Sequence, residues 1–231
     1  MKIEVLADAE AVAREAAAII AREVRTAVAA RGRFVFAVSG GHTPWVMLKA
    51  LAEEEIPWNK VHLAQVDERA APVGHPDRNL THLHESLLEH APLPPDQIYP
   101  MPVELPDLEA AAKQYATTLA TIAGEPPVFD LVHLGLGPDG HTASLVPGDR
   151  VLDVIDADVA VTGIYQGRRR MTLSYPIINR SRRIVWLVTG ADKAAMLVRL
   201  LKRDASIPAG KVSQETALVL ADRAAAEQQA P

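Results

Sequence analysis

The stretch of the chain that decides its fold class reads Phe34-Val35-Phe36-Ala37-Val38-Ser39-Gly40-Gly41-His42-Thr43-Pro44. The apolar run at its start, 34–38, is typical of a strand that is buried on both faces in a parallel sheet. Thr43 is a candidate N-cap with Pro44 at the first helical position, so we expect a helix over 45–52. A buried strand that leads through a glycine-rich turn into a helix predicts an α/β protein.

Strands and helices alternate on both sides of this stretch. Upstream, Asp8 is a candidate N-cap and Gly32 a candidate stop for a helix that ends near Ala30. Downstream, strands are expected at 61–66, 128–134, 184–188 and 217–220, helices at 80–88, 107–123 and 191–202, and a hairpin of 159–164 with 170–174 around Gln166-Gly167. This alternation predicts a doubly wound, mainly parallel sheet with helices on both faces and right-handed crossovers.

The composition is that of an ordinary globular domain. Of the 231 residues, 48% are hydrophobic and 23% are charged, which suits one α/β domain with a sizeable core. Residues 91–106 contain six prolines and are expected to form an irregular surface loop rather than a linker between domains. We therefore expect a single domain over residues 1–231.

Cysteine content, charge and hydropathy exclude several classes of protein. The chain has no cysteine, which rules out a disulfide scaffold, a thiolate zinc site and a cysteine nucleophile. His82 and His84 point apart on their expected helix, so no metal site is predicted. The net charge of −5 gives no bulk attraction to nucleic acid or anionic membranes. Acidic residues within 1–8 and the lack of a long uncharged apolar run argue against a signal peptide or a membrane span, so we expect a soluble, cytoplasmic protein.

The turn Ser39-Gly40-Gly41-His42-Thr43 has more than one interpretation. Consecutive backbone N–H groups beside a helix N-terminus form a natural phosphate site, which we favour over a tight turn without a ligand. The turn also resembles an imperfect nucleophile elbow in which Ser39 is the nucleophile. A serine esterase would then take its acid from Asp67 or Asp139 and its base from His141.

Residues Gly135-Leu136-Gly137-Pro138-Asp139-Gly140 match the dinucleotide fingerprint G-x-G-x-x-G. Pro147-Gly148 cuts short the long helix that this fingerprint requires, so we expect the glycines to turn the backbone sharply instead. Such a turn presents Asp139 and His141 at the edge of the sheet. An imidazole in a glycine-rich loop beside an acid is accessible and easily oriented, which makes His141 a candidate general base.

Charged residues at other strand ends complete a candidate anion site. Asp67-Glu68-Arg69 follow the strand 61–66, and they either form a surface charge triplet or aim the arginine at an anion. Lys193, just inside the expected helix 191–202, can reach the same crevice. Six arginines lie between 168 and 183, and we expect most of them to be solvated surface charges. These strand ends together supply the groups that bind a phosphorylated small molecule.

Several segments carry a resemblance to a known family: Ser39-Gly40-Gly41-His42-Thr43-Pro44, Val66-Asp67-Glu68-Arg69, Arg78-Asn79, Gly135-Leu136-Gly137-Pro138-Asp139-Gly140-His141-Thr142-Ala143-Ser144-Leu145-Val146-Pro147, Arg170-Met171-Thr172-Leu173-Ser174 and Thr189-Gly190-Ala191-Asp192-Lys193. In this order and spacing they resemble the 6-phosphogluconolactonase family, from the first helix to about residue 220. The resemblance implies a Rossmann-like parallel sheet with a small β/helical subregion. It also implies hydrolysis of 6-phospho-D-glucono-1,5-lactone to 6-phosphogluconate in the oxidative pentose phosphate pathway, without a metal or organic cofactor.

Two positions distinguish this chain from the patterns of its relatives. Arg78 stands where the family often has serine. Val146 stands where the related glucosamine-6-phosphate deaminases have a glutamate that assists aminosugar ring chemistry, which favours a lactonase over a deaminase. Asp67 is shared by both groups and does not discriminate between them.

For such a lactonase we expect His141 to act as the general base toward water and then as the acid that protonates O5. Asp139 would orient its imidazole, and Asp67 is a further catalytic candidate. The residues expected to bind the phosphate or the sugar are Ser39, Gly40, Gly41, Thr43, Arg69, Asn79, Arg170 and Lys193. Any one of the three cations in this set would serve the oxyanion instead of the phosphate.

Three alternatives to the lactonase stay open at this point. They are another sugar-phosphate isomerase or deaminase of the same fold, an esterase built on Ser39, and a non-catalytic sugar-phosphate-binding regulator. We expect a monomer whose partner is a small sugar-phosphate lactone, and neither nucleic acid nor a membrane.

Overall fold

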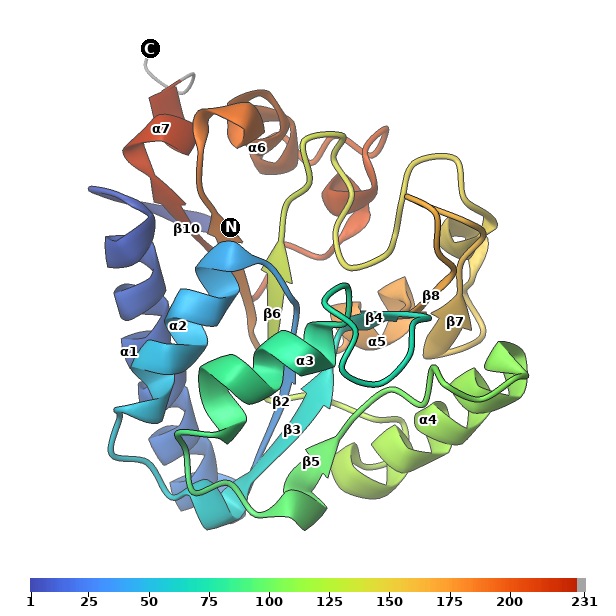
Figure 1. Ribbon diagram of the computed structural model, residues 1–231. Coiled ribbons are helices and arrows are strands. Elements are labelled where there is room, and N and C mark those ends of the chain that lie inside the picture. Colours follow the sequence, from blue (N-terminus) through green and yellow to red (C-terminus); the bar gives the residue numbers. More distant parts are fainter. Residues whose placement is uncertain (228–231) are drawn as a thin grey trace.

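Seven strands form a central parallel sheet in the computed structural model, which describes residues 1–227 (Figure 1). Their order is β1 (Lys2–Leu6), β10 (Ala217–Asp222), β9 (Ile184–Val188), β6 (Leu131–Gly135), β2 (Phe34–Val38), β3 (Val61–Gln65) and β5 (Ile98–Tyr99). Every neighbouring pair is parallel. The chain proceeds outward from β2 through β3 to β5, and in the other direction from β6 through β9 to β10. Open α/β sheets bind ligands outside the carboxyl ends of their strands at such a reversal.

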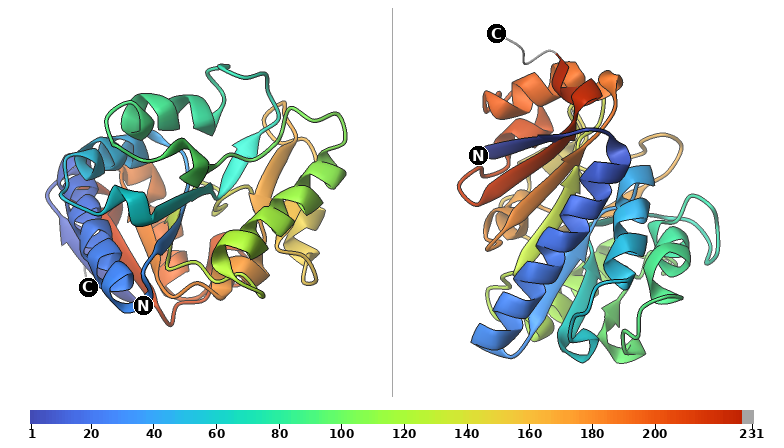
Figure 2. Two further views of the ribbon diagram at one scale, coloured as in Figure 1. Left: turned by 90° about the horizontal axis from the view of Figure 1, so that it is seen from below. Right: turned by 90° about the vertical axis from the view of Figure 1, so that its left-hand side faces the viewer.

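Helices cover both faces of this sheet, as the sequence pattern predicts. On one face lie α1 (Ala9–Arg31), α2 (His42–Ala52) and α3 (Asn79–Leu83), and on the other lie α4 (Leu108–Ala123), α5 (Tyr175–Asn179), α6 (Ala194–Leu201) and α7 (Arg223–Ala226) (Figure 2). Phe34, Phe36 and Val38 belong to the core cluster of the first face. Val35 and Ala37 belong to the cluster of the second face. Because both faces of β2 are buried, its sequence is a continuous apolar run.

A second, antiparallel sheet of β4 (Asp67–Arg69), β8 (Arg170–Leu173) and β7 (Val159–Val161) lies beside the central one. β7 and β8 form the expected hairpin, whose turn residues Gln166 and Gly167 have φ angles of 50° and 80°. Positive φ at both positions is typical of a tight hairpin turn. Met171 and Leu173 of β8 belong to the same buried cluster as residues of β6 and α4. The two sheets therefore share one core. The single domain over 1–231 stays a prediction, and residues 228–231 lie outside the described residues.

The structure differs from the sequence-based expectation at several elements. The apolar pattern does not predict β1 and β5, because these edge strands contain no buried residue. The prediction of Thr43 as an N-cap is wrong, since α2 begins at His42 after Gly41 and the Thr43 hydroxyl instead lies 2.7 Å from that of Thr189. The helix expected at 191–202 begins as a tighter turn over Ala191–Lys193 and continues as α6.

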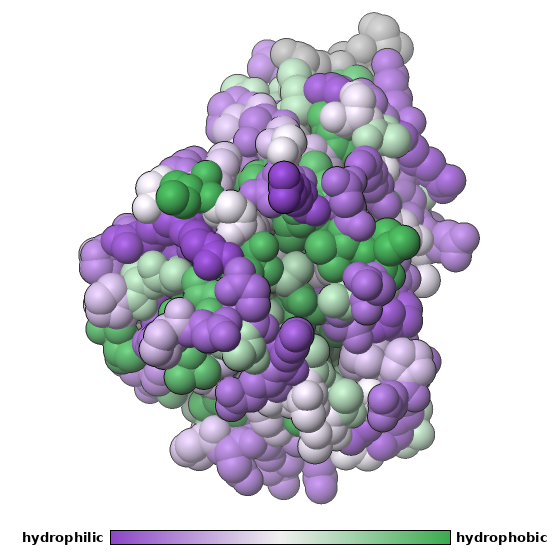
Figure 3. Space-filling view, turned by 90° about the vertical axis from the view of Figure 1, so that its right-hand side faces the viewer, coloured by the Kyte–Doolittle hydropathy of each residue, from purple (hydrophilic) through white to green (hydrophobic). Residues whose placement is uncertain are grey.

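Several large apolar side chains are exposed at separate positions along the chain. The large apolar residues with the most exposed side chains are Val5, Val73, Leu105, Ile155 and Ile164. Figure 3 shows one face of the molecule, on which apolar residues gather near the centre and hydrophilic ones surround them. Within residues 1–227, no helix combines the length and the apolar character needed to cross a membrane.

The carboxylate of Glu68, at the centre of β4, is completely buried and joins several elements. Its Oε1 accepts hydrogen bonds from the backbone N–H groups of Arg69 and Asn79, each at 2.8 Å. Its Oε2 accepts from the N–H of Leu80 at 2.8 Å and from the side-chain amide of Gln65 at 2.9 Å. A side chain of β4 thus caps the start of α3. The interpretation of 67–69 as a surface triplet is therefore wrong for Glu68.

Arg78 supplies positive charge beside this carboxylate, and its side chain is only 1% exposed. Its Nε lies 3.1 Å from Glu68 Oε2 as an ion pair that lacks hydrogen-bond alignment. Its Nη1 donates to Glu104 at 2.5 Å and to the carbonyl oxygen of Ala71 at 2.9 Å. The arginine at this position therefore compensates a buried negative charge.

Arg78→Ala should lower the free energy of unfolding by about 3–5 kcal/mol, because removing one partner of a buried ion pair leaves the other charge uncompensated. Urea denaturation followed by circular dichroism measures the change. Arg14→Ala, which removes only the exposed pair of Arg14 with Glu10, is the control and should shift the unfolding midpoint little. Equal stability of Arg78→Ala and the wild type would show that Glu68 does not need this charge.

Candidate active site

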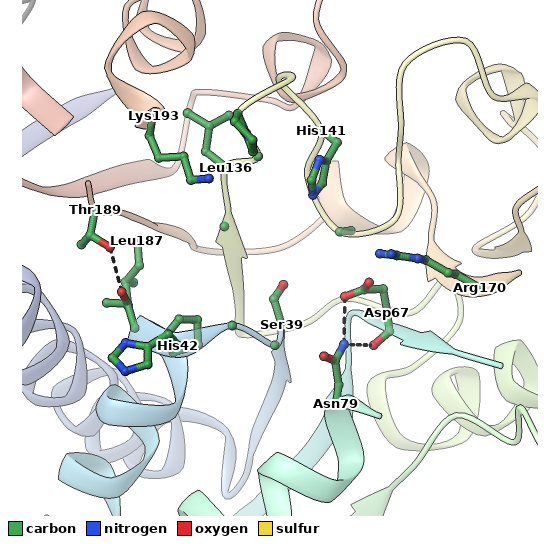
Figure 4. Close-up of a pocket in the computed structure, with 18 of the residues that line it drawn as sticks. Ser39, His42, Asp67, Asn79, Leu136, His141, Arg170, Leu187, Thr189 and Lys193 are labelled. Carbon is green, nitrogen blue, oxygen red and sulfur yellow. Dashed lines mark hydrogen bonds between the residues drawn. The ribbon is translucent and has the colours of Figure 1, made fainter. Parts of the chain in front are cut away.

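The carboxyl ends of the strands at the reversal surround a cavity of about 410 Å³, a volume typical of small-molecule sites. Separate segments form its walls: the turn 39–44 after β2, Asp67 and Arg69 of β4 with Asn79 of α3, the loop after β6 from Gly135 to Ala143, Arg170 of β8, and Leu187, Thr189 and Lys193 at and after the end of β9 (Figure 4). Every site residue predicted from the sequence lines this cavity except Asp139, which contacts His141.

The glycine-rich turn brings the backbone close to the cavity. Gly41 has a φ angle of 128°, in the region that favours glycine. A Cβ at Gly40 would lie 1.9 Å from Asn79 Oδ1, so a side chain there would separate the turn from α3. Gly41 has no side chain to cap α2, and the first N–H groups of this helix remain available to an anion.

Ser39 lines the cavity but lacks the partner that a nucleophile needs. Its Oγ donates to the carbonyl oxygen of His133 at 2.9 Å, and its N–H donates to His133 Nδ1 at 3.2 Å. Complete burial lowers the pKa of His133 to about 3, so this ring stays neutral. No base accepts the Ser39 hydroxyl proton within the described part of the chain, which argues against the esterase interpretation.

His141 projects into the cavity between Lys193 and Arg170 (Figure 4). Its Nδ1 lies 2.5 Å from Asp139 Oδ1, and its backbone N–H donates to the same oxygen at 3.1 Å. Burial alone would raise the pKa of Asp139, but hydrogen bonds from His141 and Tyr165 hold it below its usual value, so the carboxylate stays ionised. With Nδ1–H donated to Asp139, the imidazole keeps Nε2 as a free proton acceptor.

The glycines of the G-x-G-x-x-G match serve this histidine rather than a dinucleotide. A Cβ at Gly137 would lie 2.1 Å from His141 Nδ1, so only glycine leaves room for the ring. Gly140 has a φ angle of 83°, and a Cβ there would lie 2.7 Å from the Ile207 side chain. Both observations agree with the expectation that the glycines turn the backbone and present Asp139 and His141.

Asp67 is 4% exposed and is held by contacts from two segments, the loop after β6 and α3. Its Oδ2 accepts from the Ser144 hydroxyl at 2.6 Å. Asn79 Nδ2 donates to the Asp67 carbonyl oxygen at 2.8 Å and lies 3.4 Å from its Oδ1 (Figure 4). Ser144 is completely buried and donates its N–H to the Thr172 hydroxyl at 3.2 Å. Ser144 is a site residue that the sequence does not predict, although it belongs to the segment 135–147.

Arg69 and Arg170 face each other across β4 and β8, and neither forms an ion pair with a carboxylate within residues 1–227. Arg69 donates to Asn79 Oδ1 and to the carbonyl oxygen of Asp77. Arg170 is 4% exposed and leaves its Nε without a partner. Burial, and then the neighbouring charge of Arg69, lower the pKa of Arg170. Two adjacent guanidinium groups, neither of them ion-paired in the described residues, form a site for an anion.

Lys193 approaches the cavity from the opposite wall (Figure 4). Its Nζ lies 2.8 Å from Asp192 Oδ2, so this lysine forms an ion pair, whereas neither arginine does within residues 1–227. The hydrogen bond between Thr43 and Thr189 ties the turn after β2 to the end of β9 beside this lysine.

The remaining arginines of the 168–183 cluster are surface charges, as expected. Their ion pairs are Arg168–Asp77, Arg169–Glu109, Arg180–Asp158, Arg182–Asp130 and Arg183–Glu23. Tyr165 is a further residue beside the site that the sequence does not predict, and its one signal is its place before the turn Gln166-Gly167. No group of three or more His, Asp or Glu side chains in the described residues is arranged to hold a metal ion.

Comparison with known proteins agrees with this geometry. A family model described as glucosamine-6-phosphate isomerases/6-phosphogluconolactonase matches residues 7–220. A 6-phosphogluconolactonase of Synechocystis sp. is 38% identical over 208 residues, which cover 88% of this chain and 86% of that protein. The crystal structure of a 6-phosphogluconolactonase from Thermotoga maritima has a TM-score of 0.85 at 27% identity and covers 96% of this chain and 98% of that one.

A monomeric glucosamine-6-phosphate deaminase has a TM-score of 0.86 at 21% identity, over 98% of this chain and 99% of that one. At this identity the likeness shows the fold alone. The predicted α/β fold with a mainly parallel sheet is confirmed, and so is the resemblance noted in the sequence. Because the family model and the Synechocystis relative both match most of its length, the chain belongs to the glucosamine-6-phosphate isomerase/6-phosphogluconolactonase family.

Proposed function

We propose that this protein hydrolyses 6-phospho-D-glucono-1,5-lactone to 6-phosphogluconate, the second step of the oxidative pentose phosphate pathway. One observation carries the proposal: a single cavity holds an imidazole bound to an ionised carboxylate and two arginines without a carboxylate partner. Lactone hydrolysis needs a base for water, and a phosphate needs cations. The names of the relatives from Synechocystis and Thermotoga support the same activity.

Val146 favours a lactonase over a deaminase of the same family. Its side chain is 3% exposed and apolar. It therefore supplies no carboxylate where the related deaminases use a glutamate for aminosugar ring chemistry.

His141 and Asp139 account for the movement of protons in this reaction. Nε2 of His141 accepts a proton from water as the water oxygen attacks C1 of the lactone, and negative charge collects on the former carbonyl oxygen. When the C1–O5 bond breaks, the imidazolium returns the proton to O5. Asp139 holds the ring by its Nδ1–H and stabilises the imidazolium, as the acid does in a Ser-His-Asp triad.

The phosphate binds, in this proposal, between the turn 39–43 and the arginines, with the carbonyl oxygen nearer Lys193. Gly41, Arg69 and Arg170 also line an adjoining cavity of about 290 Å³, so this end of the site has room for a bulky anion. A dianion is attracted most strongly to cations that are not already ion-paired, and Lys193 is paired with Asp192.

We also propose that the enzyme is a cytoplasmic monomer that uses neither a metal nor an organic cofactor. The absence of cysteine is consistent with a reducing compartment. A δ-lactone is already electrophilic, and the protein's own cations and imidazole supply each step described above.

Arg170→Gln should raise KM for the 6-phospholactone about ten- to a hundredfold, since a hydrogen bond to a charged group contributes about 1.5–3 kcal/mol. The kcat/KM for unphosphorylated glucono-δ-lactone, which we expect to be low in the wild type, should change by less than about threefold. A pH-stat assay corrected for spontaneous ring opening measures both substrates. Arg182→Gln is the control, because it removes an exposed guanidinium whose partner Asp130 keeps its hydrogen bond from Arg31. Equal losses on both lactones would assign Arg170 to the reacting carbonyl instead.

His141→Asn should lower kcat about 10²–10⁴-fold, because it removes the general base but keeps a polar side chain. Activity of the wild type should fall as pH decreases, since only the neutral ring accepts a proton. The pKa of Asp139 lies below its usual value, so titration of this carboxylate causes no second fall in kcat between about pH 5 and 8.

The measurement is kcat for wild type and variant over this pH range, with the affinity for 6-phosphogluconate as a check that the phosphate site is intact. His90→Asn, an exposed histidine outside the cavity, is the control and should keep the wild-type profile. Retention of kcat and of the acid limb in His141→Asn would exclude it as the base and direct attention to Asp67.

Ser39→Ala should keep kcat within about tenfold of the wild type, because its hydroxyl bonds a backbone carbonyl and not a base. A serine-directed phosphonate should not inactivate the wild-type enzyme, and dialysis against EDTA should not reduce its rate. Stoichiometric labelling of Ser39 with loss of activity would favour the esterase, and loss of activity in EDTA would require a metal.

A further inference from the structure

Tyr165 lies at the tip of the β7–β8 hairpin, one residue before its turn. Its N–H donates to the Arg168 carbonyl oxygen at 2.9 Å, and the Arg168 N–H donates back to its carbonyl oxygen at 3.3 Å. Between them, Gln166 and Gly167 adopt the positive φ angles of a tight turn. The backbone that carries the tyrosine is therefore fixed by a closed hairpin.

The Tyr165 hydroxyl contacts the acid that holds the proposed base. It donates to Asp139 Oδ2 at 3.0 Å and lies 3.5 Å from His141 Nδ1. The tyrosine and imidazole rings also meet edge to face, with centroids 5.7 Å apart and planes inclined by 66°. Asp139 thus divides its two oxygens between the phenol and the imidazole, which lies 2.5 Å from Oδ1.

The face of the same ring supports the cation proposed to bind phosphate. The Arg170 Cζ lies 4.8 Å from the ring centroid, within the range of a cation–π contact. Arg170 Nη2 donates to Gln166 Oε1 at 2.9 Å, so the next residue of the turn holds the same guanidinium. The tip of one hairpin therefore contacts both the His141–Asp139 pair and the Arg170 guanidinium.

We propose that Tyr165 is a positioning residue that couples the His141–Asp139 pair to Arg170, an inference that rests on the proposed lactonase activity. Its two ends have separable effects. The hydroxyl sets the orientation and charge of Asp139, and the ring fixes the guanidinium that receives the phosphate. Removing the hydroxyl alone therefore alters proton transfer, and removing the ring also alters substrate binding.

The carboxylate of Asp139 determines in which direction the loss of the Tyr165 hydroxyl shifts the pH dependence of kcat. A phenol O–H donated to Oδ2 withdraws charge from the carboxylate, and its loss leaves more negative charge facing the imidazole. More negative charge favours the protonated ring, so the acid limb of kcat moves to higher pH. The other charged groups that line the same cavity are Asp67 and Arg69 on β4, Arg170 on β8 and Lys193 before α6. None of them changes in this substitution.

Tyr165→Phe should move the acid limb of kcat upward by roughly 0.5 pH unit, with KM within about twofold of the wild type. Below the limb this shift lowers kcat about threefold. Tyr165→Leu should show the same shift and also raise KM about three- to thirtyfold, because the cation–π contact is lost. Tyr175→Phe removes a phenol that donates to the Pro208 carbonyl oxygen and should match the wild type.

An NMR titration of the imidazole C–H signals tests the coupling without an activity assay. The His141 signal is identified by its absence in His141→Asn, and its midpoint should rise in Tyr165→Phe. A wild type that fails to accelerate lactone opening would overturn the proposed function but not this shift. An active wild type whose limb and midpoint do not move in Tyr165→Phe would overturn the coupling. If Tyr165→Leu does not fold, Tyr165→Phe alone decides the outcome.

Discussion

The arrangement of the site depends on the hydrogen bonds and the ion pair of the buried Glu68 carboxylate. A fully buried charge is tolerated only when donors and a counter-charge surround it. Here the donors are the N–H groups of Arg69, Asn79 and Leu80 and the Gln65 amide, and the counter-charge is Arg78. A chain that folded with another path between β4 and α3 would leave this charge unsatisfied. The same carboxylate therefore specifies where the guanidinium of β4 and the first amide side chain of α3 enter the cavity.

The cavity divides into groups that already have partners and groups that do not. Asp67 is engaged by Ser144 and Asn79, and the imidazole of His141 is held by Asp139. The two arginines are instead held by carbonyl, amide and aromatic groups, none of which neutralises them. The free protein thus keeps desolvated positive charge in place before its ligand arrives, which is electrostatic preorganisation. An anion that binds there also stabilises the folded state, because the unfolded chain has no such site.

Much of the fold could be predicted because the inner strands are buried on both faces, and a run such as 34–38 has no other common explanation. The edge strands β1 and β5 could not be predicted, because no residue in them is buried and they therefore lack an apolar run. Polar residues that follow a parallel strand share one edge of the sheet, which made Ser39 and His141 predictable as neighbours. The contact of Tyr165 with Asp139 depends on a hairpin that folds across a distant loop, and no local pattern encodes it. The sequence does not predict the burial of Glu68, because a charged residue between two other charged residues is typical of a solvated surface.

The parallel order of the central sheet has a practical consequence for attaching the protein to a solid support. All strands of this sheet point their carboxyl ends toward the cavity, so the segments that precede them lie at the opposite edge. Asn59, exposed in the turn just before β3, belongs to that far edge. The chain has no cysteine of its own. A cysteine introduced at position 59 would be its sole thiol, and coupling through it would leave every immobilised molecule with its cavity open to the flowing solution.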